Sequence, residues 1–121
     1  MSNRPAWAAR VTDPEVEALR AEARTAMAAP MARAGERVIE DDALWAPVEL
    51  AIHRCLWLAL ERHYARLGAP MPSPSALPDD LAARDAPGGV LLRRLLRAPD
   101  TRARYVFLED FLGHLYGTVG G

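Results

Sequence analysis

The stretch from Pro47 to Leu67 constrains the fold of this chain more than any other part of the sequence. Its apolar residues recur at the spacing of one helix face, and Gly68 is a natural C-terminal stop for a helix. At 1.5 Å per residue the helix would be about 30 Å long. The rest of the chain, 121 residues in all, must therefore pack around it. The face that we expect to be buried consists of Ile52, Leu56, Leu60, Tyr64 and Leu67.

Capping residues predict the other helices. An Asp-Pro pair opens a first helix over residues 13–28, which we expect to stop before Pro30. A Pro-Asp pair precedes a last helix over residues 101–116. Residues 90–97, after two glycines, predict a short amphipathic helix, and residues 31–42 a short helical turn and connector.

Prolines and the absence of strand patterns complete the expected fold. Five prolines between residues 69 and 89 predict a connector that is extended or turn-like, interrupted at most by one helical turn over 79–84. Residues 1–12 are expected to form a loose N-terminal arm. No stretch alternates as a half-buried strand does. We therefore predict one all-α domain over residues 1–121, a small irregular helical bundle of three main helices plus one or two short helices.

Composition excludes several chemistries. All 15 basic residues are arginine, and the missing lysine excludes a phosphate-binding P-loop and Schiff-base pyridoxal chemistry. No serine lies in a Gly-x-Ser-x-Gly turn. The formal net charge of -1 gives no general attraction to nucleic acid or membrane.

Cysteine usage and apolar runs predict a location. Cys55 is the only cysteine, and the first residues lack the apolar core of a secretory signal. The longest uninterrupted apolar run, residues 55–60, is far shorter than the ~20 residues of a membrane span. We therefore expect a cytoplasmic protein with no membrane association.

Glu49 and His53 are polar residues that share the apolar side of the Pro47–Leu67 helix. Four residues apart, they would lie roughly 6 Å from each other. A carboxylate and an imidazole one turn apart can ligate a metal, or act as a base with its orienting group. With His63 at the edge of the same face, and with Trp57 and Tyr64 near it, they form a candidate ligand site whose cofactor the sequence does not name.

Two other interpretations of this site stay open. The last helix repeats the spacing in Asp110 and His114, and facing helices would give a cage of two carboxylates and two histidines. Helix geometry instead places Asp110 and His114 away from the apolar stripe, as a solvated ion pair. In the purely structural interpretation, Glu49 is favoured by the helix dipole and His53 is a hydrogen-bonded histidine at the core boundary.

Arginines cluster in a second candidate region, residues 93–104, where Arg93, Arg94 and Arg97 form the polar side of the short helix. They could contact nucleic acid or another polyanion. However, no known DNA-binding module is present, and such arginines more often form a solvated face that pairs with acids elsewhere. We therefore do not expect nucleic acid to be the main partner.

The Pro47–Leu67 helix carries apolar residues even on its charged side, where Leu58 and Ala65 lie. A helix that is apolar nearly all round is usually buried on more than one side. Our first hypothesis is therefore a small accessory or protein-interaction subunit without chemistry of its own, forming a homo-oligomer or docking on a larger protein. One alternative is a metal- or ligand-binding protein, which could be an enzyme, that uses Glu49 and His53. The other is a regulatory protein that binds a polyanion through Arg93, Arg94 and Arg97.

Overall fold

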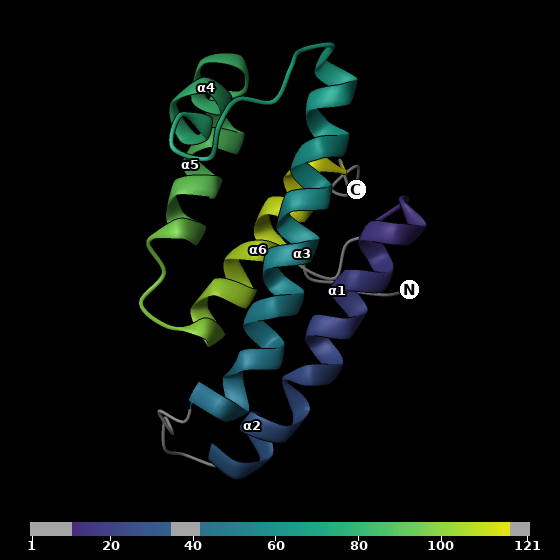
Figure 1. Cartoon of the computed structure of the whole chain (residues 1–121), viewed down its shortest axis with the longest axis vertical. Helices are drawn as coiled ribbons and strands as arrows, with labels where there is room; N and C mark the ends of the chain where they lie inside the picture. The colour runs from purple at the N-terminus through teal and green to yellow at the C-terminus, as the bar shows by residue number, and fades with distance from the viewer. Residues whose placement is uncertain (1–10, 35–41, 117–121) are drawn as a thin grey trace, which may run out of the picture.

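A computed structural model describes residues 11–34 and 42–116, and within these ranges the chain is all-helical (Figure 1). The bundle and its three main helices confirm the predicted fold class. Three short helices accompany them, where one or two were expected. The elements are α1 (Pro14–Ala26), α2 (Ala28–Ala34), α3 (Asp42–Leu67), α4 (Leu77–Arg84), α5 (Ala86–Leu96) and α6 (Thr101–Leu115).

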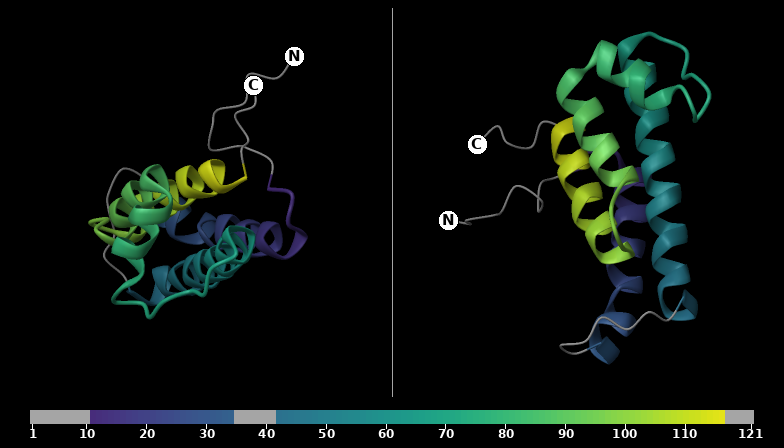
Figure 2. Two further views of the ribbon diagram at one scale, coloured as in Figure 1. Left: turned by 90° about the horizontal axis from the view of Figure 1, so that it is seen from above. Right: turned by 90° about the vertical axis from the view of Figure 1, so that its left-hand side faces the viewer.

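The long helix α3 organises the bundle. Helices α1 and α6 both pack along it, α5 packs on α6, and α4 packs on α5 (Figures 1 and 2). Helices α1 and α6 also contact each other, because Arg20 of α1 pairs with Glu109 of α6, so they cover neighbouring parts of the α3 surface. The side of α3 away from them is left without a covering helix in the described ranges.

Local capping chemistry explains where the main helices begin and end. The Asp13 carboxylate accepts hydrogen bonds from the backbone N–H groups of Glu15 and Val16, and Asp100 accepts one from Ala103. Gly68 ends α3 with φ of 69°, in the left-handed region that favours glycine. These three boundaries confirm the predictions from sequence.

Several prolines lie inside helices, so the non-helical connector is shorter than expected. Pro78 and Pro87 are the second residues of α4 and α5, and Pro30 is the third residue of α2. Backbone N–H groups in a first turn have no partner within the helix, so proline is tolerated there. The connector predicted over 69–89 is therefore non-helical only over residues 69–76 and at Asp85. Residues 77–84 form a complete helix, and α5 begins at Ala86 instead of residue 90. The arm proposed for residues 1–12 falls almost wholly outside the described ranges.

Helix α3 also begins earlier than expected, at Asp42 instead of Pro47. Proline at this position removes one backbone donor, and the packing of the remaining turns outweighs that loss. By length and composition, Ala43–Leu67 could cross a membrane, with a mean hydropathy of 1.3 over its most apolar window. Only 39% of that window is buried in the bundle. A core helix of a soluble protein passes the same test.

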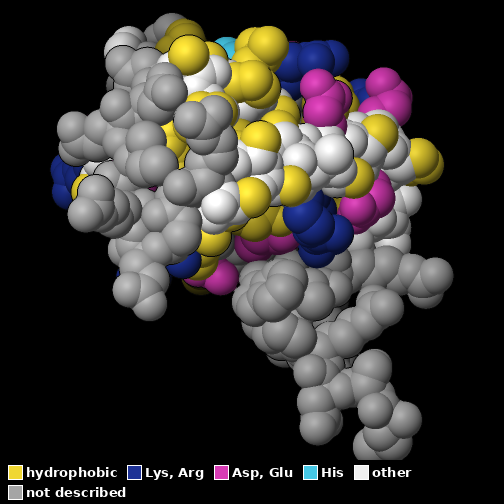
Figure 3. Space-filling view, turned by 90° about the horizontal axis from the view of Figure 1, so that it is seen from below, with side chains coloured by type: hydrophobic (Ala, Val, Ile, Leu, Met, Phe, Trp, Pro, Cys, Tyr) yellow, Lys and Arg dark blue, Asp and Glu magenta, His cyan; other side chains and the backbone are white. Residues whose placement is uncertain are grey.

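Hydrophobic side chains also reach the surface. Figure 3 looks at the end of the molecule where α2 lies, and there hydrophobic groups are interspersed with arginine and acidic side chains. Among the large hydrophobic residues, Leu50, Val90 and Leu96 are each more than half exposed. These residues belong to α3 and α5, and Val106 of α6 is 49% exposed, so the exposed apolar surface is divided among three helices.

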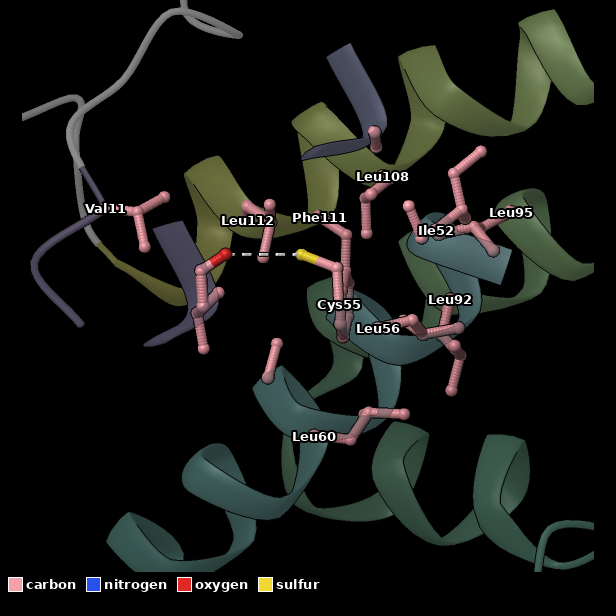
Figure 4. Close-up of a cluster of buried hydrophobic side chains, with 14 of the residues drawn as sticks. Val11, Ile52, Cys55, Leu56, Leu60, Leu92, Leu95, Leu108, Phe111 and Leu112 are labelled. Atoms are coloured by element: carbon pink, nitrogen blue, oxygen red, sulfur yellow. Dashed lines mark hydrogen bonds between the residues drawn. The ribbon is translucent and has the colours of Figure 1, made fainter. Parts of the chain in front are cut away.

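The core is built around the predicted face of α3 (Figure 4). Ile52, Leu56, Leu60 and Tyr64 are buried as expected. Leu67 is 39% exposed, so its predicted burial is wrong; it is the last residue of α3, where the chain turns away at Gly68. The partners from other helices are Val16, Ala23, Leu77, Leu81, Leu92, Leu95, Leu108, Phe111 and Leu112.

Candidate functional site

Glu49 and His53 do not converge in the structure. The half-buried Glu49 carboxylate accepts hydrogen bonds from the Thr101 hydroxyl and the Arg104 guanidinium, both on α6. His53 is exposed, and its Nδ1 accepts a hydrogen bond of 3.1 Å from Trp57 Nε1. The hydrogen bonds of Glu49 therefore link α3 to α6, while His53 faces solvent. In the described ranges, no three histidine, cysteine or acidic residues are arranged to hold a metal ion.

Tyr64, the other predicted ligand-binding residue, joins α3 to α4. Its hydroxyl donates a hydrogen bond of 2.5 Å to Asp80, which also accepts one from Arg84. Burial, together with the Asp80 carboxylate, raises the pKa of Tyr64 to about 12. The hydrogen bonds from Tyr64 and Arg84 lower the pKa of Asp80. Tyr64 is thus a buried, un-ionised donor that positions α4.

His63 belongs to a cluster that the sequence did not reveal. Asp85 Oδ2 lies 3.1 Å from His63 Nε2 and 2.8 Å from His114 Nε2, so one carboxylate oxygen accepts from two imidazoles. Asp85 Oδ1 accepts from the backbone N–H of Gly88 at the start of α5. A Cβ on Gly88 would stand 2.4 Å from Asp85 Oδ2, so glycine allows this close approach. The cluster joins α3, α5 and α6 at one point.

The protonation of this cluster favours a structural role over acid–base chemistry. Burial lowers the pKa of His63, Arg66 and His114 lower it further, and the Asp85 carboxylate offsets this only in part. The pKa of Asp85 is also lowered, because its hydrogen bonds outweigh the effect of burial. His63 Nδ1 is buried and has no hydrogen-bond partner in the described residues. With both Nε2 atoms directed at Asp85, neither is left for a substrate.

Asp110 and His114 do not pair with each other, since His114 turns to Asp85. The acid of α6 that is buried is instead Glu109, which is only 2% exposed. It accepts hydrogen bonds from Arg20 and Arg24 of α1 and from the Tyr105 hydroxyl. No local sequence pattern indicates this network, because Arg20 is 89 residues away from Glu109.

Arg93, Arg94 and Arg97 do share a surface. They line an open hollow of about 500 Å³ together with Val90, Pro99 and Phe107. Arg93 forms an ion pair with Asp79 of α4. Arg94 and Arg97 are exposed and have no acidic partner among the residues that the structure describes. The predicted partner-binding arginines are thus brought together beside apolar groups.

The exposed side of α3 is the other surface without a covering element. We define the open face of α3 as Ala46, Pro47, Leu50, His53, Arg54, Trp57 and Glu61. These residues recur at helical spacing, and all are exposed except the half-buried Trp57. Leu50 is 58% exposed. The open face is therefore mainly apolar. Its arginine lies on one side of the tryptophan and its glutamate on the other.

Comparisons with protein-family models, with curated proteins and with solved structures find no match to this chain.

Proposed function

We propose that the protein is a protein-interaction subunit that pairs with a second copy of itself through the open face of α3. The observation that carries the proposal is the exposure of Leu50 in the N-terminal half of the longest helix. Burying a leucine side chain contributes roughly 1.5–3 kcal/mol. Because more than half of the Leu50 side chain stays exposed in the bundle, a partner surface can bury the rest of it and gain part of this free energy.

The distribution of charge favours a second copy over an unrelated partner. Arg54 and Glu61 lie seven residues apart, about 10 Å along the helix axis, and Trp57 lies midway between them. In an antiparallel pair of α3 helices related by a twofold axis near Trp57, Arg54 of each copy falls opposite Glu61 of the other. A twofold interface requires a self-complementary surface of this kind.

Neither charge is strongly engaged within one copy. Arg54 pairs with Glu22 of α1 at 3.5 Å, and both side chains are more than half exposed. Such surface pairs contribute little to stability. Glu61 has no ion pair in the described part of the chain. Both side chains are therefore available to a second copy.

Sedimentation equilibrium tests the proposal on the full chain. We expect a dimer in the wild-type protein, and a Leu50→Glu variant in which dimerisation is at least about tenfold weaker because a charge replaces the exposed leucine of the open face. Val106→Glu is the matched control, since Val106 is 49% exposed on α6, outside the open face. A monomeric wild-type protein at millimolar concentration would contradict the proposal.

Vesicle flotation separates a second copy from a membrane as the occupant. α3 is apolar enough to enter a bilayer by composition, so the wild-type protein is mixed with neutral phosphatidylcholine vesicles. We expect it to stay in the lipid-free fraction. Flotation that Leu50→Glu abolishes, with a monomer in solution, would assign the open face to lipid and overturn pairing.

A further inference from the structure

The hollow between α5 and α6 differs from the open face of α3 in both position and chemistry. Its lining residues come from α5, α6 and the segment between them, and none comes from α3. Its volume of about 500 Å³ lies in the range typical of small-molecule sites. A ligand in this hollow would therefore not touch the open face of α3.

Charge in this hollow is unbalanced. Its three charged lining residues are all arginine. Asp79 neutralises Arg93, which leaves the exposed Arg94 and Arg97 as two uncompensated cations three residues apart. Like charges one helical turn apart repel each other. An anion placed between the two guanidinium groups would relieve this repulsion and accept hydrogen bonds from both.

Apolar groups lie beside these cations. Val90 is 51% exposed, and the half-buried Phe107 packs against the hydrophobic core while also lining the hollow. Pro99 provides a third apolar surface. A fully polar anion would leave this surface in water, whereas a ligand with an apolar portion would cover it.

We propose that this hollow binds a phosphate monoester that carries an aromatic or aliphatic group. A phosphate monoester has a charge of about −1.5 to −2 at pH 7, which matches the two unpaired arginines. Its oxygens suit bidentate hydrogen bonds from guanidinium groups. A carboxylate would neutralise only one of the two arginines. The ester group lies against Val90 and Phe107.

NMR titration of the isotope-labelled full chain with phenyl phosphate tests the site. We expect saturable shifts of the Val90 methyl and Phe107 ring signals. Arg94→Gln and Arg97→Gln should each weaken binding about tenfold, because each removes one charge-assisted contact. Arg102→Gln is the matched control: Arg102 is an exposed arginine of α6 that does not line the hollow, and binding should change less than about twofold.

Binding of three further ligands, and the Arg102→Gln control, can each contradict the proposal. Inorganic phosphate and benzoate should each bind at least about tenfold more weakly than phenyl phosphate, since each lacks half of the recognised chemistry. Benzoate binding as tightly as phenyl phosphate would overturn the choice of phosphate. An equal loss in Arg102→Gln would reveal nonspecific attraction. Tighter binding of a single-stranded oligonucleotide at the same signals would assign the surface to nucleic acid.

The same titration on Leu50→Glu keeps the two proposals separable. Because Leu50 is not part of the hollow, phenyl phosphate should bind this variant as it binds the wild-type protein. Failure of one proposal therefore leaves the other standing.

Discussion

Nε of Arg20 in α1 lies 2.7 Å from Oε1 of Glu109 in α6, and both side chains are almost completely buried. A buried ion pair is costly to break, because removing one partner leaves the other charge in a medium that solvates it poorly. We expect Glu109→Ala to lower the free energy of unfolding by about 3–5 kcal/mol, measured by urea denaturation. Glu22→Ala, which removes only an exposed pair with Arg54, should cost less than about 1 kcal/mol.

The double variant Arg20→Met/Glu109→Leu distinguishes ion pairing from simple packing. It removes both charges and keeps apolar volume, so its free energy of unfolding should lie well above that of Glu109→Ala. Arg20 also pairs with Glu17 at 2.8 Å, so Glu109→Ala removes only one of its acidic partners. If the double variant is as unstable as the single one, the loss comes from packing and not from the missing charge of Glu109.

Acidification should destabilise the bundle through His63. The pKa of His63 is lowered in the folded state, so below its ordinary value of 6.5 the unfolded chain binds a proton that the folded chain does not. The contribution of His63 to the free energy of unfolding is therefore complete above pH 6.5 and is lost as the pH falls toward its folded-state pKa. The lowered pKa of Asp85 adds a second loss below its ordinary value of 3.8.

Urea denaturation at pH 7.5, 6.0 and 5.0 measures this dependence. His63→Gln keeps a donor that can reach Asp85 and does not titrate, so its stability should fall less over this range. His53→Gln removes an exposed histidine and should retain the wild-type dependence. A wild-type profile in His63→Gln would show that another group is responsible.

Gly89 allows α5 to approach α4 closely. A Cβ at this position would lie 2.5 Å from the backbone Cα of Ala82, so the two helices would have to move apart. We expect Gly89→Ala to lower the free energy of unfolding by roughly 1–3 kcal/mol despite alanine's higher helix propensity. Calorimetry would show this as a lower Tm, whereas a higher Tm would mean that the two helices can separate without loss.

Cys55 should be unreactive in the folded protein. Its Sγ is buried 3.6 Å from the carbonyl oxygen of Val16, and burial, with a contribution from Glu109, raises its pKa to about 12. Reaction with an aromatic disulfide at pH 8 should be more than about 100-fold slower than in urea-unfolded protein, because the thiolate is the reacting form. Rapid labelling without denaturant would contradict its burial.

Local signals predicted the fold better than they predicted the site. Asp13, Asp100 and Gly68 act on neighbouring residues, so their effects can be read from short stretches of sequence. The helix α4 was underestimated because Pro78 suggested a break, although proline is compatible with a first helical turn.

The candidate site depends on contacts between distant residues, which spacing along one helix does not predict. Their spacing places Glu49 and His53 on one helix face. In the structure, however, Glu49 pairs with Arg104 of α6, which is 55 residues away in the sequence. Asp85 reaches His63 and His114 across 22 and 29 residues. Arg93, Arg94 and Arg97 were found because they are neighbours on one helix; that Phe107 lies beside them follows only from the packing of α5 on α6.

The most direct test of the account is a charge exchange at Arg54 and Glu61, followed by sedimentation equilibrium. Arg54→Glu and Glu61→Arg alone each place like charges opposite each other in the antiparallel pair, so each should weaken dimerisation by about tenfold. The double variant restores opposite charges in every cross-pair, and its dimer should approach wild-type strength. Dimerisation that the single changes leave intact, or that the double variant fails to recover, would contradict pairing through the open face of α3.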